Sequence, residues 1–209
     1  MNDISKSIGW AHFSWNPVTG CKRGCTYCYA KRNWDRLHRK RVGCEFNEIR
    51  FYPERLSDPH LWRLPPSKIF VGSMSDPEYW DNFDMAKILN ECRIRTKHTF
   101  MFLSKNSRSY DGFCWPINTM QGLTLTGKEH FTTQFQMIAE IIDQPRPFLS
   151  IEPLLGNVVA PIPDNVETVI VGAMTGPGAV PPEKEWIDTI KNKNLGEKIY
   201  WKNNIRKYL

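Results

Sequence analysis

Three cysteines follow one another closely at Cys21, Cys25 and Cys28, in the spacing C-x3-C-x2-C. Thiolates are soft ligands that suit zinc, copper(I) or iron–sulfur clusters. A structural zinc site usually closes with four ligands, and a cubane cluster is usually held by four cysteines. Because the local count stops at three, a cluster bound here would leave one iron open to another ligand. The spacing therefore predicts an iron–sulfur cluster with an open iron, a zinc site or a disulfide loop.

The neighbours of these cysteines bear on the choice. Gly24 allows a tight turn around a metal centre, and Tyr27 stands directly before Cys28, where its ring can cover a flat ligand. For a zinc site, His12 is the best candidate for a fourth ligand. The remaining cysteines are scattered, so we expect buried or incidental thiols rather than a second cluster at Cys44, Cys92 and Cys114.

Size and composition set the class of protein. The chain has 209 residues, of which 41% are hydrophobic and 12% aromatic, which predicts one globular domain over residues 1–209. We find neither an apolar signal segment nor a run long enough to cross a membrane. Six cysteines are too few for a disulfide scaffold and favour a reducing cytoplasm. The net charge of +6 favours an anionic partner, although an ordinary basic enzyme fits equally well.

The elements that must position the cysteines follow from the apolar pattern. Short apolar runs alternate with helical patterns, which predicts parallel strands joined by right-handed crossovers. The expected strands cover residues 10–15, 69–73, 99–103, 122–125, 146–151, 168–171 and 198–201. The expected helices cover residues 29–41, 81–97, 128–143 and 182–191, the second of them capped by Asp81. In the third, Phe131, Phe135, Ile138 and Ile142 share one face. Residues 42–68 lack periodicity and predict a connecting excursion with one short helix.

Small or polar residues follow most of these strands. In a β/α barrel the carboxyl ends of the strands share one face, where active sites lie. The cysteine loop follows the first strand and is therefore expected on the same face. The residues expected there are Ser73, Asp76, Lys105, Thr124, Thr126, Glu152, Thr175 and Lys202. This convergence favours an iron–sulfur cluster over zinc.

The predicted helix after the cysteines is strongly basic. It carries Arg36, Arg39, Lys40 and Arg41, together with Trp34 as a stacking side chain. Such a helix is typical of a patch that binds nucleic acid or phosphate. A simply solvated helix face is an equally good interpretation.

The cysteine spacing, with an aromatic residue before the last thiol, resembles the radical S-adenosylmethionine (radical SAM) superfamily. Further blocks resemble a phage- and prophage-associated family of radical-SAM-like proteins, and Cys-x-Tyr-Cys-Tyr locally resembles the spore photoproduct lyase branch. The blocks are Trp15-Asn16-Pro17-Val18-Thr19-Gly20-Cys21, Phe70-Val71-Gly72-Ser73-Met74-Ser75-Asp76, Phe148-Leu149-Ser150-Ile151-Glu152-Pro153-Leu154-Leu155-Gly156 and Val169-Ile170-Val171-Gly172-Ala173-Met174-Thr175-Gly176-Pro177-Gly178-Ala179. Together they run nearly from end to end of the chain.

The resemblance implies an α/β fold, a partial (β/α) barrel of about six to seven mostly parallel strands. It implies a [4Fe–4S] cluster on Cys21, Cys25 and Cys28, whose open iron binds SAM. The reduced cluster of that superfamily cleaves SAM to methionine and a 5′-deoxyadenosyl radical, which abstracts hydrogen from a substrate.

The resemblance also implies roles for the residues after the strands. Those expected near SAM are Tyr27, Ser73, Met74, Ser75, Asp76, Thr124, Thr126 and Glu152, and those expected near substrate are Lys105, Lys202, Arg36 and Arg39. Three of the residues expected near SAM have a structural alternative. Asp76 can cap a turn before Pro77, Glu152 can be a buried carboxylate paired with Lys105 or Lys202, and Met74 can pack the core.

Three functions remain open from the sequence. The first is a radical SAM enzyme that acts on a nucleotide or nucleic acid, in modification or repair. The second is a radical SAM enzyme that acts on a small molecule or peptide. The third is a zinc or iron–sulfur module that binds nucleic acid without catalysis. For an enzyme we expect a reductant such as flavodoxin or ferredoxin, a partner protein or large substrate that closes the open barrel, and the cytoplasm of a bacterium or phage-infected host.

Overall fold

The computed structural model describes residues 1–6 and 8–209, and of these it leaves the side chain of Arg41 undescribed. The chain divides into two compact units. The first comprises Met1–Leu103 and Asp111–Thr119, and the second comprises Ser104–Tyr110 and Met120–Leu209. Each unit is described by itself below.

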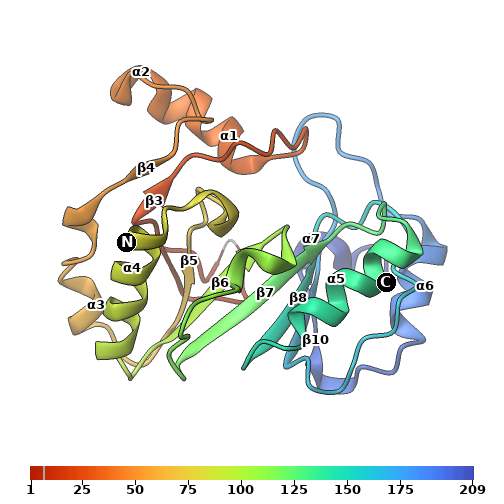
Figure 1. Cartoon of the computed structure of the whole chain (residues 1–209). Helices are drawn as coiled ribbons and strands as arrows, with labels where there is room; N and C mark the ends of the chain where they lie inside the picture. Colours follow the sequence, from red (N-terminus) through yellow and green to blue (C-terminus); the bar gives the residue numbers. More distant parts are fainter. Residues whose placement is uncertain (7) are drawn as a thin grey trace. The chain divides into compact units, whose positions relative to one another are not determined.

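A mostly parallel sheet forms the centre of the first unit, in the order β1-β2-β5-β6. Figure 1 labels β5 and β6 of this sheet. Its strands are β1 (Asn2–Asp3), β2 (Phe13–Trp15), β5 (Lys68–Val71) and β6 (Thr99–Ser104). β2, β5 and β6 are parallel, whereas β1 pairs antiparallel with β2. Strands β5 and β6 are apolar on both faces because both faces are covered, as parallel sheets require. Helix α4 (Asn82–Ile94) begins at Asp81, whose side chain accepts a hydrogen bond from Phe83 N at 2.8 Å.

The chain between β2 and β5 makes a long excursion that contains the cysteines. It begins with β3 (Val18–Thr19), which pairs antiparallel with β4 (Arg50–Phe51). Between them lie α1 (Tyr29–Asn33), the π-helical turn η1 (Trp34–His38) and α2 (Arg39–Val42), which ends at Gly43 with a left-handed φ of 70°. The short helices η2 (Pro53–Arg55) and α3 (His60–Arg63) follow β4. The pairing of β3 with β4 therefore fixes both ends of the segment that carries the thiols.

The second unit contains a fully parallel sheet in the order β7-β8-β9-β10. Its strands are β7 (Thr119–Leu125), β8 (Pro147–Ile151), β9 (Thr168–Val171) and β10 (Ile199–Trp201). Its helices are η4 (Ser107–Tyr110), α5 (Phe131–Ile141), α6 (Lys184–Lys191), η5 (Gly196–Lys198) and α7 (Asn203–Arg206). All residues of β7 and β8 are buried, as expected for strands covered on both faces.

The structure confirms an α/β fold with mostly parallel strands. Every predicted strand and helix is present, the strand over 168–171 with the same bounds and the others with shifted ends. The single domain over residues 1–209 stays a prediction. Several features differ from expectation. The excursion over 42–68 contains two short helices, η2 and α3, where one was predicted. The antiparallel β1 and the β3–β4 pair were not predicted, because two-residue strands give no periodic signal. The predicted helix over 29–41 continues to Val42 with a π-helical turn inside it.

The predicted apolar face of α5 is also wrong in part. Phe131 and Phe135 are 49% and 54% exposed, whereas Gln134, Ile138 and Ile141 are buried. Gln134 is buried because it bridges backbone groups: its Nε2 donates to Glu129 O and Asn157 O, and its Oε1 accepts from Val159 N. A polar side chain with several backbone partners has thus displaced two aromatic rings from the core. No helix in the described part of the chain has the length and apolar character needed to cross a membrane.

Candidate functional site

The three cysteines lie in a loop that starts where β3 ends. Gly20 precedes the loop with φ +94°, and a Cβ there would lie 2.1 Å from the carbonyl oxygen of Glu48. Cys21 N donates to Phe46 O at 2.8 Å, which anchors the loop to the chain returning toward β4. Cys21, Cys25 and Cys28 are half-buried and form no disulfide. The disulfide loop left open by the sequence is therefore not formed here.

The last cysteine of the loop caps the helical stretch that follows. Cys28 Sγ accepts a hydrogen bond from Lys31 N at 3.3 Å, and Cys28 N donates to Cys25 O at 3.1 Å. Cysteine thus occupies the N-cap of α1, where Ser, Thr, Asp or Asn is usual.

Two of the thiols border a small apolar cluster. Ala30, Trp34, Cys44 and Phe46 are buried together, and Cys21, Cys28, Val42 and Met74 pack against them. Burial raises the pKa of Cys21 to about 11, an effect that Asp76 and the two other thiols of the loop reinforce. At neutral pH Cys21 is therefore a thiol, and a metal that binds it must displace a proton.

The three thiols of the loop are the ligand type that the predicted iron–sulfur cluster needs. Three reduced thiols from one loop, two of them against an apolar wall, provide the ligands that iron–sulfur clusters use. Within residues 1–6 and 8–209, however, no group of three or more His, Cys, Asp or Glu side chains is arranged to hold a metal ion. The ligand types therefore fit a cluster, and binding would require the loop to draw its sulfurs together.

The segment after β5 lies against the cysteine loop. Ser75 forms an isolated parallel bridge with Gly20, and its Oγ donates to Gly20 O at 2.6 Å. Gly20 N donates to Met74 O at 3.0 Å, and the Tyr29 hydroxyl donates to Ser73 O at 2.5 Å. The structure thus brings Ser73, Met74, Ser75 and Asp76 together with the loop, at the carboxyl ends of neighbouring parallel strands.

Asp76 makes a structural contact at this position. Its carboxylate accepts from Glu78 N at 3.1 Å and caps the 3-10 helix η3 (Pro77–Tyr79), as the sequence alternative proposed. Arg23, from the cysteine loop, lies 3.9 Å from Asp76 Oδ2 and forms an ion pair with Glu78. Burial lowers the pKa of Arg23, but the two carboxylates more than offset this and raise it overall. Burial beside Glu78 also raises the pKa of Tyr79 to about 12.

The other predicted cofactor residues belong to the second unit. Thr124 is buried on β7, and Thr126 follows it. Thr126 Oγ1 donates to Glu129 Oε1 at 2.8 Å, and Glu129 also accepts from Gly127 N at 2.8 Å. Thr126 thus already takes part in the turn that leads toward α5.

Glu152 and Lys202 form an ion pair in the same unit, with side chains 27% and 11% exposed. This pairing is one of the two structural alternatives that the sequence allowed for Glu152. A Cβ on Gly172 would lie 3.0 Å from Glu152 Oε1, so the glycine leaves room for the pair. Lys105 is half-buried just after β6.

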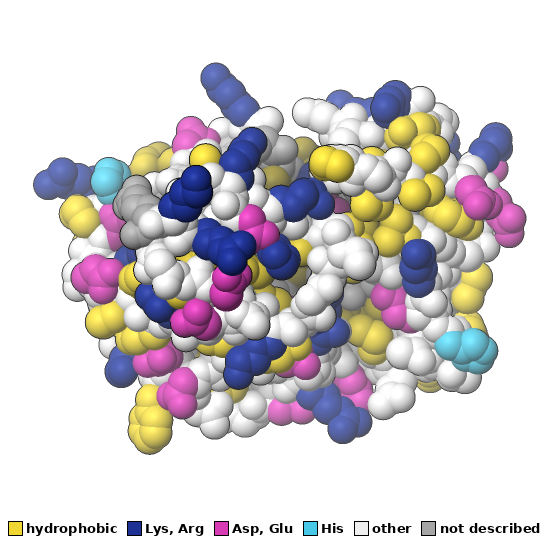
Figure 2. Space-filling view, turned by 90° about the horizontal axis from the view of Figure 1, so that it is seen from above, with side chains coloured by type: hydrophobic (Ala, Val, Ile, Leu, Met, Phe, Trp, Pro, Cys, Tyr) yellow, Lys and Arg dark blue, Asp and Glu magenta, His cyan; other side chains and the backbone are white. Residues whose placement is uncertain are grey.

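The predicted cations of the basic helix are exposed. Arg36 Nη2 donates to Asn33 Oδ1 at 3.4 Å, and Arg39 forms an ion pair with Glu45. Lys40 is exposed, and the side chain of Arg41 lies outside the described residues. Figure 2 shows Lys and Arg side chains interspersed with acidic ones on the face it presents. The basic character of this face is therefore partly neutralised.

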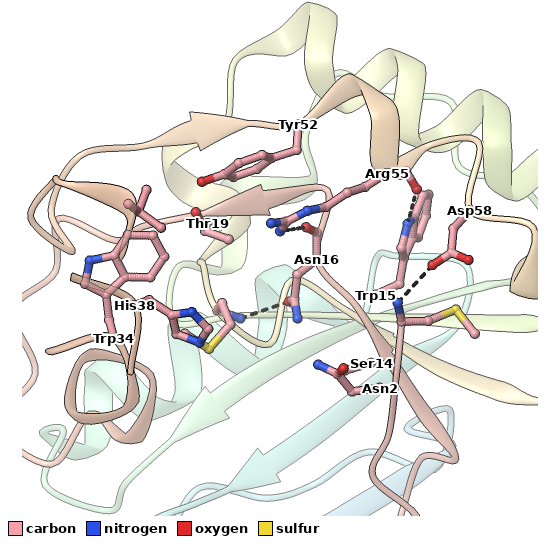
Figure 3. Close-up of a pocket in the computed structure, with 13 residues that line it drawn as sticks. Asn2, Ser14, Trp15, Asn16, Thr19, Trp34, His38, Tyr52, Arg55 and Asp58 are labelled. Atoms are coloured by element: carbon pink, nitrogen blue, oxygen red, sulfur yellow. Dashed lines mark hydrogen bonds and ion pairs between the residues drawn. The ribbon is translucent and has the colours of Figure 1, made fainter. Parts of the chain in front are cut away.

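A pocket of about 310 Å³ opens in the first unit (Figure 3). Its lining includes Asn2, Ser14, Trp15, Asn16, Thr19, Trp34, His38, Tyr52, Arg55, Asp58 and Met74. Sequence reasoning missed this pocket. Asn16 and Thr19 stand in the turn before the cysteines and carried some signal, whereas Tyr52, Arg55 and Asp58 lie in the excursion without periodicity.

Comparison with known proteins gives one family. No curated protein and no solved structure matches the chain. The profile of the family described as "Protein of unknown function (DUF5131)" matches residues 5–203, and the chain therefore belongs to this family.

Proposed function

We propose that the protein is a radical SAM enzyme whose [4Fe–4S] cluster is held by Cys21, Cys25 and Cys28 within a partial (β/α) barrel. When bound and reduced, such a cluster supplies the electron that cleaves SAM to methionine and a 5′-deoxyadenosyl radical. One observation carries the proposal. Three thiols without a disulfide lie in the loop after β3, and hydrogen bonds of Gly20 at its start join this loop to the segment after β5. Active sites of parallel α/β folds occupy this edge.

The residues of the chain have distinct parts in this proposal. The three cysteines bind iron, and Cys21 gives up its proton when it does so. Ser73, Met74, Ser75 and Asp76 border the loop and are proposed to orient SAM, with Tyr27 beside Cys28. Thr124, Thr126 and Glu152 stay proposed SAM-binding residues, on the family resemblance alone. Flavodoxin or ferredoxin is the proposed reductant, in a cytoplasmic setting.

Metal loading gives the first test. Anaerobic reconstitution with iron and sulfide should give about four irons per chain and a brown absorbance. Cys→Ala at position 21, 25 or 28 should abolish loading. The matched controls Cys92→Ala and Cys114→Ala, which change one buried and one exposed thiol, should load normally. Stoichiometric zinc in place of iron would contradict the proposal.

Cofactor cleavage gives the second test. Dithionite reduction of the loaded protein with SAM should yield 5′-deoxyadenosine, slowly in the absence of substrate. Asp76→Ala or Glu152→Ala should weaken SAM binding or uncouple cleavage. If both variants bind and cleave SAM as the wild type does, Asp76 and Glu152 act only as the turn cap and the ion-pair partner described above.

A second candidate is a zinc-bound module, favoured by the position of Cys44. This thiol is buried in the apolar cluster against which Cys21 and Cys28 pack. A fourth cysteine so close in the fold could close a tetrahedral zinc site. Cys44→Ala separates the candidates, because it should abolish zinc binding but leave a three-cysteine cluster intact.

The substrate is proposed to be a nucleotide or nucleic acid. The exposed cations Arg36, Arg39 and Lys40 follow the cysteine loop directly and support this class. Lys105 and Lys202 are the proposed substrate contacts of the second unit. A small molecule or peptide as substrate is the alternative, and a partner protein that closes the barrel is compatible with both.

A further inference from the structure

The pocket of the first unit has features that point to a ligand. The pocket is lined by β1, β2, the turn after β2, β3, η1, α2, the excursion after β4, and Met74 after β5 (Figure 3). None of the three cysteines lines it. Its volume of about 310 Å³ lies at the lower end of the range for small-molecule sites, roughly 300–1,000 Å³. It therefore suits one small molecule or a single extruded nucleotide rather than a duplex.

Thr19 contributes a buried hydroxyl to the wall. The residue is 4% exposed, and its Oγ1 makes no hydrogen bond within the part of the chain that the structure describes. Buried hydroxyls are nearly always paired, because an unpaired one loses its hydration without compensation. A ligand oxygen or nitrogen in the pocket would satisfy it.

Arg55 contributes a cation to the same wall. Its Nη1 donates to Asn16 O at 2.8 Å, and its guanidinium lies 3.8 Å from the ring centre of Tyr52. No carboxylate among the described residues forms an ion pair with it; Asp58 in the neighbouring wall pairs with the Met1 amine and with His60. A half-buried, fixed guanidinium without an acidic partner favours an anionic ligand, above all a phosphate.

The remaining walls are aromatic and amide-rich. Trp34 and His38 lie with ring centres 5.6 Å apart at one side of the pocket, and Tyr52 lies above Arg55 in Figure 3. Asn2, Ser14 and Asn16 supply hydrogen-bonding groups. Trp34 is itself buried, so a planar base would pack against the half-buried rings of His38 and Tyr52, since every base has a π-face.

We infer that this pocket binds one nucleotide, with its phosphate at Arg55 and the Thr19 hydroxyl and its base against the His38 side. The assignment of the pocket to a substrate rests on the proposed function, whereas the binding itself needs no cluster. The nucleotide comes either free in solution or as one residue of a single strand, because a base inside a duplex must first be extruded.

Calorimetry on the full chain tests the inference with 5′-AMP, 5′-GMP, 5′-CMP and 5′-UMP, and with adenosine and inorganic phosphate as partial ligands. At least one nucleotide should bind saturably and more tightly than either partial ligand. Arg55→Gln should weaken binding by about tenfold or more, the range expected for a lost charged hydrogen bond. Arg63→Gln, which removes an exposed arginine of the same unit, is the matched control and should bind as the wild type does.

Thr19 gives an independent variant, because Arg55 also supports Asn16 and its loss can disturb folding. Thr19→Val keeps the shape of the side chain and should weaken binding by about two- to tenfold, whereas Thr19→Ser should bind nearly as the wild type does. A short single-stranded oligonucleotide should compete with the free nucleotide if the source is nucleic acid, and a duplex should compete poorly. If only the free nucleotide binds, the source is the mononucleotide pool.

Three outcomes would overturn the inference: no saturable binding, binding unchanged in both Arg55→Gln and Thr19→Val, or displacement of the nucleotide by SAM, which would assign the pocket to the cofactor. Cys21→Ala separates this test from that of the proposed function, since it should lose iron and keep nucleotide binding. If the wild-type protein loads iron and cleaves SAM but binds no nucleotide, the substrate lies elsewhere and the proposed function still stands.

Discussion

Arg23, which stands between the first two cysteines, forms an ion pair with Glu78 on the 3-10 helix η3 after β5. The pair joins two segments that are 55 residues apart in sequence. Together with the bond from Ser75 Oγ to Gly20 O, it holds the cysteine loop at the end of β5. The position of the thiols is therefore set from both ends of the loop and from its middle.

Breaking this ion pair should loosen the loop. Arg23→Gln should speed amide exchange across residues 21–28, because the middle of the loop loses its anchor. The two side chains are 29% and 24% exposed, so the free energy of unfolding should fall by only about 0.5–1 kcal/mol. Glu78→Gln should act alike, and the double variant should lose no more than either single one. Additive losses with unchanged exchange would contradict the anchoring role.

Two glycines of the same region should respond differently to Ala. Gly20 has φ +94° and its added Cβ would meet the Glu48 backbone at 2.1 Å, whereas Gly24 has φ +72° and open space around it. Gly24→Ala should cost about 1–2 kcal/mol of unfolding free energy, from backbone strain alone. Gly20→Ala adds a clash between the new Cβ and the Glu48 backbone, and it should lower the free energy of unfolding distinctly more than Gly24→Ala does. Urea unfolding of the two variants measures the difference, and equal losses would contradict it.

Much of the fold, and the place of the cysteine loop in it, could be predicted because local sequence patterns determine them. The apolar runs 168–171 and 99–103 match β9 and β6 within one residue, and the turn before Pro77 is capped by Asp76 as its residue type indicates. The cysteine loop follows the first parallel strand, as expected.

What could not be predicted depends on contacts distant in sequence. The pocket joins Ser14 and Asn16 to Tyr52 and Arg55, which lie in the excursion after β4. No periodicity marks that excursion, because the pairing of β3 with β4 and single side-chain bonds hold it in place. The exposure of Phe135 on α5 also depends on contacts distant in sequence. The neighbouring Gln134 is buried instead, because its side chain forms hydrogen bonds with backbone groups such as Asn157 O. Periodicity reports average burial and does not identify such partners.

The ion pair of Glu152 with Lys202 allows a test of whether Glu152 is structural. Lys202→Met should lower the free energy of unfolding by about 1–3 kcal/mol, because it leaves a carboxylate that is largely removed from water without its cation. Glu152→Gln with Lys202→Met should recover part of the loss. Glu152→Gln alone leaves the more buried Lys202 without its carboxylate and should also lower stability; if Glu152 serves SAM, this variant should in addition abolish cleavage while the protein is still folded. Thermal unfolding and 5′-deoxyadenosine release, measured on the same samples, separate the two roles.

His98 should make stability depend on pH. Its ring is 1% exposed, and Nε2 bonds to Leu61 O at 2.8 Å. Burial, aided by Lys97 and Arg95, lowers the pKa of His98 below its usual value near 6.5. The unfolded chain therefore takes up a proton at a higher pH than the folded one. The stabilisation is complete above about pH 6.5 and is lost as the pH falls toward the folded pKa.

The measurement is urea unfolding at pH 7.5 and 5.5. The wild type should lose up to about 1.4 kcal/mol per pH unit through this single proton below pH 6.5. His98→Gln keeps a donor for Leu61 O and should be less stable at pH 7.5 but less sensitive to the change in pH. An unchanged pH dependence in His98→Gln would assign the effect to other groups.

The basic stretch after the cysteines gives the test of nucleic-acid binding. Arg36, Arg39 and Lys40 are exposed, so these three side chains can make at most three phosphate contacts, and the pairing of Arg39 with Glu45 competes with one of them. Each phosphate contact on a single strand contributes roughly 0.7 to the slope of log affinity against log salt concentration. Replacing the three residues by Gln should therefore flatten that slope by at most about 2, and by less if Arg39 stays paired with Glu45.

The matched triple control replaces three exposed cations of the second unit, Lys184, Lys191 and Lys207. If both triples change the slope alike, the attraction comes from net charge alone; if neither does, this stretch is a solvated helix face and the substrate is a small molecule.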